Sequence, residues 1–113
     1  MTQNFNLHTF TRGLPCTATV AKVANSDSVF TVLAASDARA GFIIENDSGG
    51  AAVKVKLGSG AAADDYSFLL AAGARYECPP GAVYVGIITA IAASVSGALR
   101  VTQLTPTRID IGF

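Results

Sequence analysis

The chain has 113 residues and no net formal charge, because eight Lys and Arg balance eight Asp and Glu. This length suits one domain with one hydrophobic core. Nucleic acid is not an expected partner, because the chain lacks the clustered positive charge that binds a phosphate backbone. Charged residues make up 14% of the chain, against about 25% in an ordinary soluble domain. We therefore expect part of the surface to be buried between subunits.

The first segment, residues 1–15, is expected to be an extended arm or an edge strand. Phe5, Leu7 and Phe10 are large apolar residues among polar neighbours. Either the segment is the first strand of its own domain, or these residues anchor it on a neighbour's groove or sheet edge. The start lacks the basic region and continuous apolar stretch of a secretory signal, so cytoplasmic synthesis is expected.

Residues 16–113 are expected to form one β-sandwich domain. Runs at residues 17–23 and 28–35 alternate between apolar and polar or small side chains, and a turn separates them, so they predict a hairpin. Runs at residues 42–46 and 53–57 flank a glycine-rich turn and predict a second hairpin.

Four more runs of strand length follow, with turn residues between them. They cover residues 66–70, 75–78, 83–88 and 99–104. No segment keeps a helical period over three turns. The pattern predicts an all-β fold, a single-domain β-sandwich or jelly-roll-like fold with about eight short antiparallel strands.

The uncharged segment from Cys78 to Leu99 raises the question of a membrane span. Its apolar centre, Ala82 to Ala93, is twelve residues long. As a helix it would cover about 18 Å, well short of a hydrocarbon core of about 30 Å. No membrane partner is expected.

The side chains that catalysis and metal binding need are scattered. His8 is the single histidine and lies in the expected arm. Cys16 and Cys78 are far apart and belong to no CxxC pair, so two free buried thiols are the default and a disulfide is the alternative. Asp64-Asp65 is an adjacent carboxylate pair without the spaced oxygens of a calcium loop. We expect no enzyme activity, no metal and no cofactor.

Four stretches between residues 39 and 104 resemble small structural proteins of tailed-phage virions. They read Arg-x-Gly-Phe-Ile-Ile-Glu-Asn-Asp-Ser from Arg39, Val-Lys-Val-Lys-Leu-Gly-Ser-Gly from Val53, Asp-Tyr-Ser-Phe-Leu-Leu from Asp65 and Gly-Ala-Leu-Arg-Val-Thr from Gly97. The resemblance implies a virion component made in the host cytoplasm.

Within that resemblance, the expected function is capsid decoration. Such a cement protein binds across subunits of the major capsid protein and stabilises the head. The implied partners are the major capsid protein and copies of the chain itself, with a trimer slightly favoured over a dimer. The alternatives are a tail or head-fibre base or adaptor component, and a carbohydrate-binding β-sandwich, which the absence of tryptophan disfavours.

The candidate contact residues lie at the two ends of the chain. Burying each of these large apolar side chains is worth roughly 1.5–3 kcal/mol, so they are expected to pack against a neighbouring subunit or the capsid. They are Phe5, Leu7, Phe10, Ile109, Ile111 and Phe113.

Overall fold

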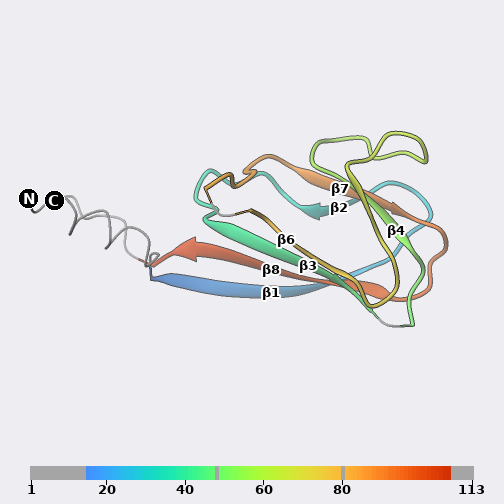
Figure 1. Ribbon diagram of the computed structural model, residues 1–113, viewed down its shortest axis with the longest axis horizontal. Coiled ribbons are helices and arrows are strands. Elements are labelled where there is room, and N and C mark those ends of the chain that lie inside the picture. The colour runs from blue at the N-terminus through green and yellow to red at the C-terminus, as the bar shows by residue number, and fades with distance from the viewer. Residues whose placement is uncertain (1–14, 48, 80, 108–113) are drawn as a thin grey trace, which may run out of the picture.

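The computed structural model describes residues 15–47, 49–79 and 81–107. Within these ranges the chain forms eight strands and no helix, and the strands build two four-stranded antiparallel sheets that pack face to face (Figure 1). The expected all-β sandwich is confirmed. The strands are β1 (Cys16–Ala24), β2 (Phe30–Leu33), β3 (Gly41–Asn46), β4 (Val53–Lys56), β5 (Phe68–Leu70), β6 (Arg75–Glu77), β7 (Ile88–Ala92) and β8 (Ala98–Pro106).

The strand order is that of a jelly roll. One sheet has the order β1-β8-β3-β6 and the other has the order β2-β7-β4-β5. The chain crosses from one sheet to the other at almost every connection, and only β4 and β5 are neighbours both in sequence and in a sheet. Each sheet therefore gathers strands that are far apart in the chain.

The two predicted hairpins are wrong. β1 and β2 lie in different sheets, as do β3 and β4. The turn after β3 contains its own bond from Gly50 N to Asp47 O but forms no hairpin. Asp47 N donates to Ala98 O at 3.2 Å and Ala51 N donates to Ser96 O at 3.0 Å. These bonds tie the turn to the β7–β8 connection, and they direct the chain across the core into the facing sheet.

The predicted strand at residues 83–88 is also shifted. β7 begins only at Ile88 and continues to Ala92, while the preceding residues form a loop. The carbonyl groups of this loop accept hydrogen bonds from another part of the chain: Val85 O from Ser36 N at 2.8 Å, and Tyr84 O from the Arg39 side chain. A backbone held in this way is not available for a strand ladder.

The core lies between the inner faces of the two sheets. Its largest fully buried apolar side chains come from both layers, with Phe42, Ile44, Leu99 and Val101 on one sheet and Val53, Val55 and Ile88 on the other. At the β5–β6 side, the rings of Phe68 and Tyr76 stack with centroids 4.1 Å apart and so join the two sheets. The apolar residues that alternate with polar ones in the sequence thus point inward and fill the layer between the two sheets.

Truncation of a core leucine should cost far more stability than the same change on the surface. Leu99 is fully buried, whereas Leu69 is 51% exposed. We expect Leu99→Ala to lower the free energy of unfolding by about 2–5 kcal/mol, because it leaves a cavity between the sheets. Urea unfolding followed by circular dichroism measures this loss. Leu69→Ala is the matched control, and equal losses in both variants would contradict the assigned inner face.

Candidate functional site

The six terminal residues expected to make contacts lie outside the described residues, so their positions remain predictions. The two segments that carry them leave the sandwich from neighbouring positions. Thr107 N, just after β8, donates a hydrogen bond to Pro15 O, just before β1, at 3.1 Å. The residues concerned are Phe5, Leu7, Phe10, Ile109, Ile111 and Phe113.

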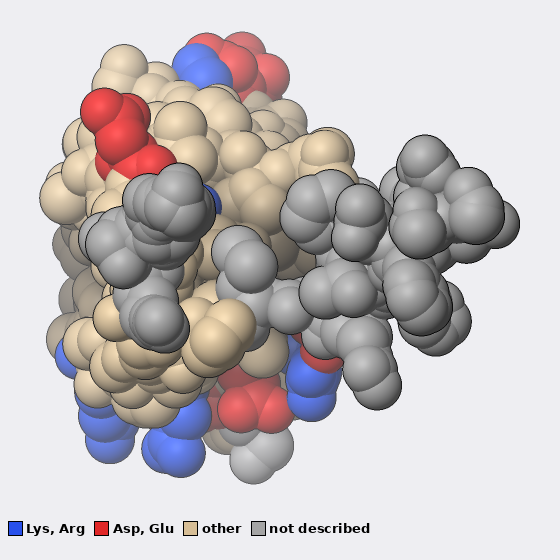
Figure 2. Space-filling view, turned by 90° about the vertical axis from the view of Figure 1, so that its left-hand side faces the viewer, with Lys and Arg blue, Asp and Glu red and all other residues tan. Residues whose placement is uncertain are grey.

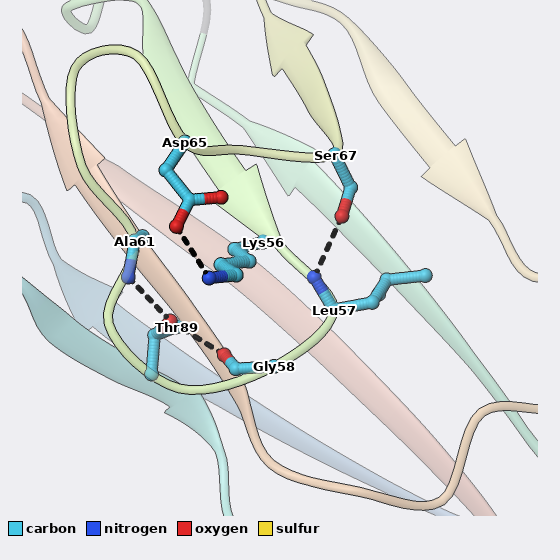
Figure 3. A network of polar contacts seen from close by, with 7 residues as sticks. All are labelled: Lys56, Leu57, Gly58, Ala61, Asp65, Ser67 and Thr89. Carbon is cyan, nitrogen blue, oxygen red and sulfur yellow. Dashed lines mark hydrogen bonds and ion pairs between the residues drawn. The ribbon is translucent and has the colours of Figure 1, made fainter.

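A polar network beside β4 holds a loop against the sheet (Figure 3). The Thr89 hydroxyl accepts from Ala61 N at 3.1 Å and donates to Gly58 O at 2.7 Å. Lys56 pairs with Asp65 at 2.7 Å across the same loop. Thr89 is buried and engaged as both donor and acceptor. The network anchors a loop. The Thr89 hydroxyl gives its proton to the Gly58 carbonyl and has no adjacent base among the described residues, so it is not placed as a nucleophile.

Neither of two hollows on the described surface has the make-up of an active site. One, of about 180 Å³, lies on the outer face of the β4–β7 sheet and is lined by Leu69, Ile91, alanines and Lys54. Its surface is almost entirely apolar, and the Lys54 ammonium is bonded to Ala63 O. The other, of about 290 Å³, is polar and lined by Glu45, Asn46, Asp47, Gly73 and Arg100. It lies at the end of β3, where strand β8 places Arg100 opposite Glu45.

Charged and metal-binding side chains are thinly spread over the described part of the chain. Figure 2 shows a surface that is mainly uncharged, with the charged side chains in small separate groups. Across residues 15–47, 49–79 and 81–107 there is no group of three or more side chains able to hold a metal ion. The same ranges contain no helix long and apolar enough to cross a membrane.

Both cysteines are free thiols. Cys78 is half-buried, and its Sγ accepts a hydrogen bond from Phe42 N at 3.4 Å. Cys16 is exposed at the start of β1, so the expectation that both thiols are buried is wrong for this residue. Its exposure follows from the position of β1, which lies at the edge of its sheet.

Arg39 is the most deeply buried charged residue described, with 4% of its surface exposed. Nε donates to Gln103 Oε1 at 2.8 Å, and the terminal nitrogens donate to backbone carbonyls of Ala34, Tyr84 and Gly86 at 2.6–3.1 Å. The guanidinium also lies over the Phe42 ring, 5.6 Å from its centroid. Loss of solvent lowers the pKa of this guanidinium. Its partners are neutral, so its role is to hold loops together.

Strand β1 differs from the other three sheet edges. β5 and β6 have three residues each, and β6 carries an Arg75–Glu77 ion pair. β2 has four residues and an irregular register between Thr31 and Leu33. Short strands, charges and bulges all protect an edge from pairing with another chain. β1 has nine residues in continuous register with β8, and Lys22 is its single charge.

The backbone of β1 presents every second residue to the open side. Asn25 N donates to Gly97 O, and Thr107 N donates to Pro15 O, both at 3.1 Å. Since hydrogen-bonded pairs alternate along an antiparallel ladder, the odd-numbered residues of β1 bond to β8. The even-numbered residues direct their N–H and C=O groups to the other side, where the described part of the chain provides no strand. They are Cys16, Ala18, Val20, Lys22 and Ala24.

The side chains of β1 leave this edge open from both faces. Eight of its nine residues are exposed, and only Val23 is half-buried against the core. Val20 is 61% exposed at the middle of the strand. In Figure 1, β1 runs along the lower rim of the sandwich with no other element beyond it. This edge is the candidate functional site, and the sequence pattern of residues 17–23 predicts only that it is a strand.

Comparisons with known proteins return one weak structural likeness. No protein-family model matches the chain, and the search of curated proteins gives no match. A similar solved structure is dTDP-4-dehydrorhamnose 3,5-epimerase from Bacillus anthracis with TDP and PPi bound. It has 12% sequence identity and a TM-score of 0.44, over 92% of this chain and 61% of that one. The chain thus spans less than two thirds of that protein.

This finding corrects the function expected from the sequence. The likeness returned is to an enzyme and not to a virion component, so capsid decoration, stated as the expected function together with its tail-component and carbohydrate-binding alternatives, is wrong. A likeness this weak carries no epimerase activity to this chain. Jelly rolls also host many unrelated functions, so the function of this chain depends on its own site and not on its fold.

Replacement of Arg39 by lysine should destabilise the sandwich strongly. A lysine ammonium keeps the charge but cannot reach the same spread of acceptors, and buried carbonyl groups lose their donors. We expect Arg39→Lys to lower the free energy of unfolding by about 3 kcal/mol or more, measured by urea unfolding. Arg100→Lys, at an exposed position of β8, is the control, with an expected change within about 0.5 kcal/mol. Similar effects at both positions would refute the role given to Arg39.

Proposed function

We propose that this chain is a non-catalytic assembly protein that associates with copies of itself by strand addition at β1. The observation that carries the proposal is the nine-residue edge of β1, which has one charged residue, no bulge and no proline. An edge of this kind is a template for a further strand. Strand addition combines backbone hydrogen bonds with side-chain contacts on both faces.

The energetics make side-chain contact necessary as well as strand pairing. A backbone hydrogen bond formed in place of bonds to water contributes about 0.5–1.5 kcal/mol. The pairing of one strand is then of the same order as the cost of association, about 4–15 kcal/mol. Burial of the exposed Val20 side chain supplies part of the surplus. Association at micromolar concentration is consistent with this balance.

A non-catalytic role is supported by how the polar groups are used. The Arg39 guanidinium and the Thr89 hydroxyl both bond to loop backbone. Cys16 and Cys78, the two thiols, lie on different strands or loops with no histidine described beside them. Arg39 and Thr89 thus hold loops in place, and none of the four side chains forms a nucleophile–base pair of the kind that acyl or group transfer requires with another described residue.

The geometry of the edge favours a two-fold dimer. An isologous contact brings the same strand of two copies together. A two-fold axis makes these two strands run antiparallel, as an antiparallel β ladder requires. A trimer, slightly preferred on the sequence resemblance, would need β1 to contact a different surface of the next copy. The other described edges are short, charged or irregular.

Proline at position 20 should weaken association and leave the fold intact. The N–H of Val20 faces away from β8, so its loss removes no bond within the domain, and proline is tolerated at such an edge position. On the open side the same change removes a donor and blocks the ladder. We expect Val20→Pro to weaken dimerisation by about tenfold or more, equivalent to about 1.4 kcal/mol, in sedimentation velocity at micromolar concentration.

Two controls separate association from folding. Val95→Pro alters another strongly exposed valine, 69% exposed and outside the strands, and should leave dimerisation unchanged. Circular dichroism should show the same β content for Val20→Pro as for the parent chain. A parent chain that is monomeric throughout the micromolar range would sink the proposal, as would undiminished dimerisation of Val20→Pro.

A further inference from the structure

We infer that β1 pairs antiparallel with β1 of a second copy, with Val20 on the two-fold axis. This inference rests on the proposed self-association and adds the partner strand and its register. The two sheets with the order β6-β3-β8-β1 then become one continuous eight-stranded sheet. Both copies keep their second sheet on the same side, where the inward-facing side chains of β1 are exposed and leave room.

The phase of the backbone groups sets the first condition on the register. Only the even-numbered residues of β1 direct N–H and C=O to the open side. Each of them has to face an even-numbered residue of the partner strand for both bonds of a hydrogen-bonded pair to form. A pairing of even with odd residues would place these groups opposite residues whose own N–H and C=O groups bond to β8, so half of all possible shifts are excluded.

The number of groups satisfied sets the second condition. With the axis at Val20, Cys16 faces Ala24 of the copy, Ala18 faces Lys22, and Val20 faces itself. Every residue of β1 that directs its N–H and C=O to the open edge then faces another such residue in the β1 strand of the copy. An axis at any other residue leaves at least one of them beyond the end of the partner's β1. The Val20 register is therefore the one with the most backbone bonds.

Charge and side-chain size agree with the same register. Lys22 faces Ala18, and the two lysines are separated by four residue steps along the ladder, roughly 14 Å. An axis at Lys22 would place the two ammonium groups directly opposite each other, which is destabilising. On the face toward the core, Thr17 faces Val23 and Thr19 faces Ala21, all small or β-branched residues that suit strand pairs.

The two valines at the axis supply apolar contact. Val20 is 61% exposed in the isolated chain, and in the dimer it packs against its own copy on the outer face of the joined sheet. Thr102 on β8 is the cross-strand neighbour of Val20 and is half-buried. The axis therefore falls at an uncharged part of the outer face.

The register can be tested with the natural thiol of Cys16. In the proposed dimer, residue 24 of the copy lies opposite Cys16 on the same face, with a Cα–Cα distance of about 5.5 Å. This lies within the range of about 4.4–6.8 Å that a disulfide spans. Ala24→Cys should therefore give a covalent dimer with two symmetric bridges under mild oxidation. Trypsin cuts at Lys22, so mass spectrometry of the peptides distinguishes position 16 from position 24.

Lys22→Cys is the matched control, because it lies on the same face two residues nearer the axis. Its opposite residue is Ala18 of the copy, and Cys16 lies one pair further along, roughly 9 Å away and beyond disulfide reach. We expect most chains of Ala24→Cys, and few of Lys22→Cys, to migrate as dimers on a non-reducing gel. Light scattering under reducing conditions should show the same non-covalent dimer for Ala24→Cys as for the parent.

The outcomes separate the register from self-association. A dimer in solution that bridges through Lys22→Cys and not through Ala24→Cys overturns the register and leaves self-association standing. A ladder of larger covalent species overturns the closed two-fold arrangement. A parent chain and an Ala24→Cys variant that are both monomeric and give no bridge overturn the register and the proposed function together.

Discussion

The buried guanidinium of Arg39 joins the two loops at one end of the β2–β7 pair to strand β8 of the facing sheet. It bonds to the loop after β2 through Ala34, to the loop before β7 through Tyr84 and Gly86, and to β8 through Gln103. The donors of a planar guanidinium point in fixed directions, so this one group fixes the positions of all its acceptors relative to one another. At the opposite end of β3, the buried side chains of Asn25 and Asn46 donate to backbone carbonyl groups, and backbone segments also pack closely. There Gly97 approaches Gly50 so closely that a Cβ on Gly97 would lie 2.5 Å from the Gly50 Cα.

Much of the fold could be predicted because alternation reports burial directly. In β4 the valines at positions 53 and 55 face the core and the lysines at positions 54 and 56 face outward, as their order indicates. Alternation does not report which strands are neighbours, because a strand in the same sheet and one in the facing sheet bury the same face. Both hairpin predictions failed for this reason. The strand predicted at residues 83–88 failed because its backbone is held by Arg39, far away in the sequence.

The candidate site was less accessible to sequence reasoning than the fold. Residues 17–23 were recognised as a strand, but whether a strand lies at an edge depends on the order of the whole sheet. β8, its single neighbour among the described residues, comes near the other end of the chain. One signal was present: the run from Cys16 to Ala24 contains one charge and no proline or glycine. Set beside the charged or very short runs elsewhere, that composition indicates an edge without protection.

The hydrogen bond from Thr107 N to Pro15 O has a consequence for the reach of a dimer. It brings the first and last described residues of one chain to the same end of the β1–β8 pair. In an antiparallel pairing of two β1 strands, this end of one copy lies beside the far end of β1 in the other. The two pairs of terminal segments then start roughly 34 Å apart, at opposite corners of the shared sheet. The terminal segments of such a dimer therefore leave it at two separate places and not at one.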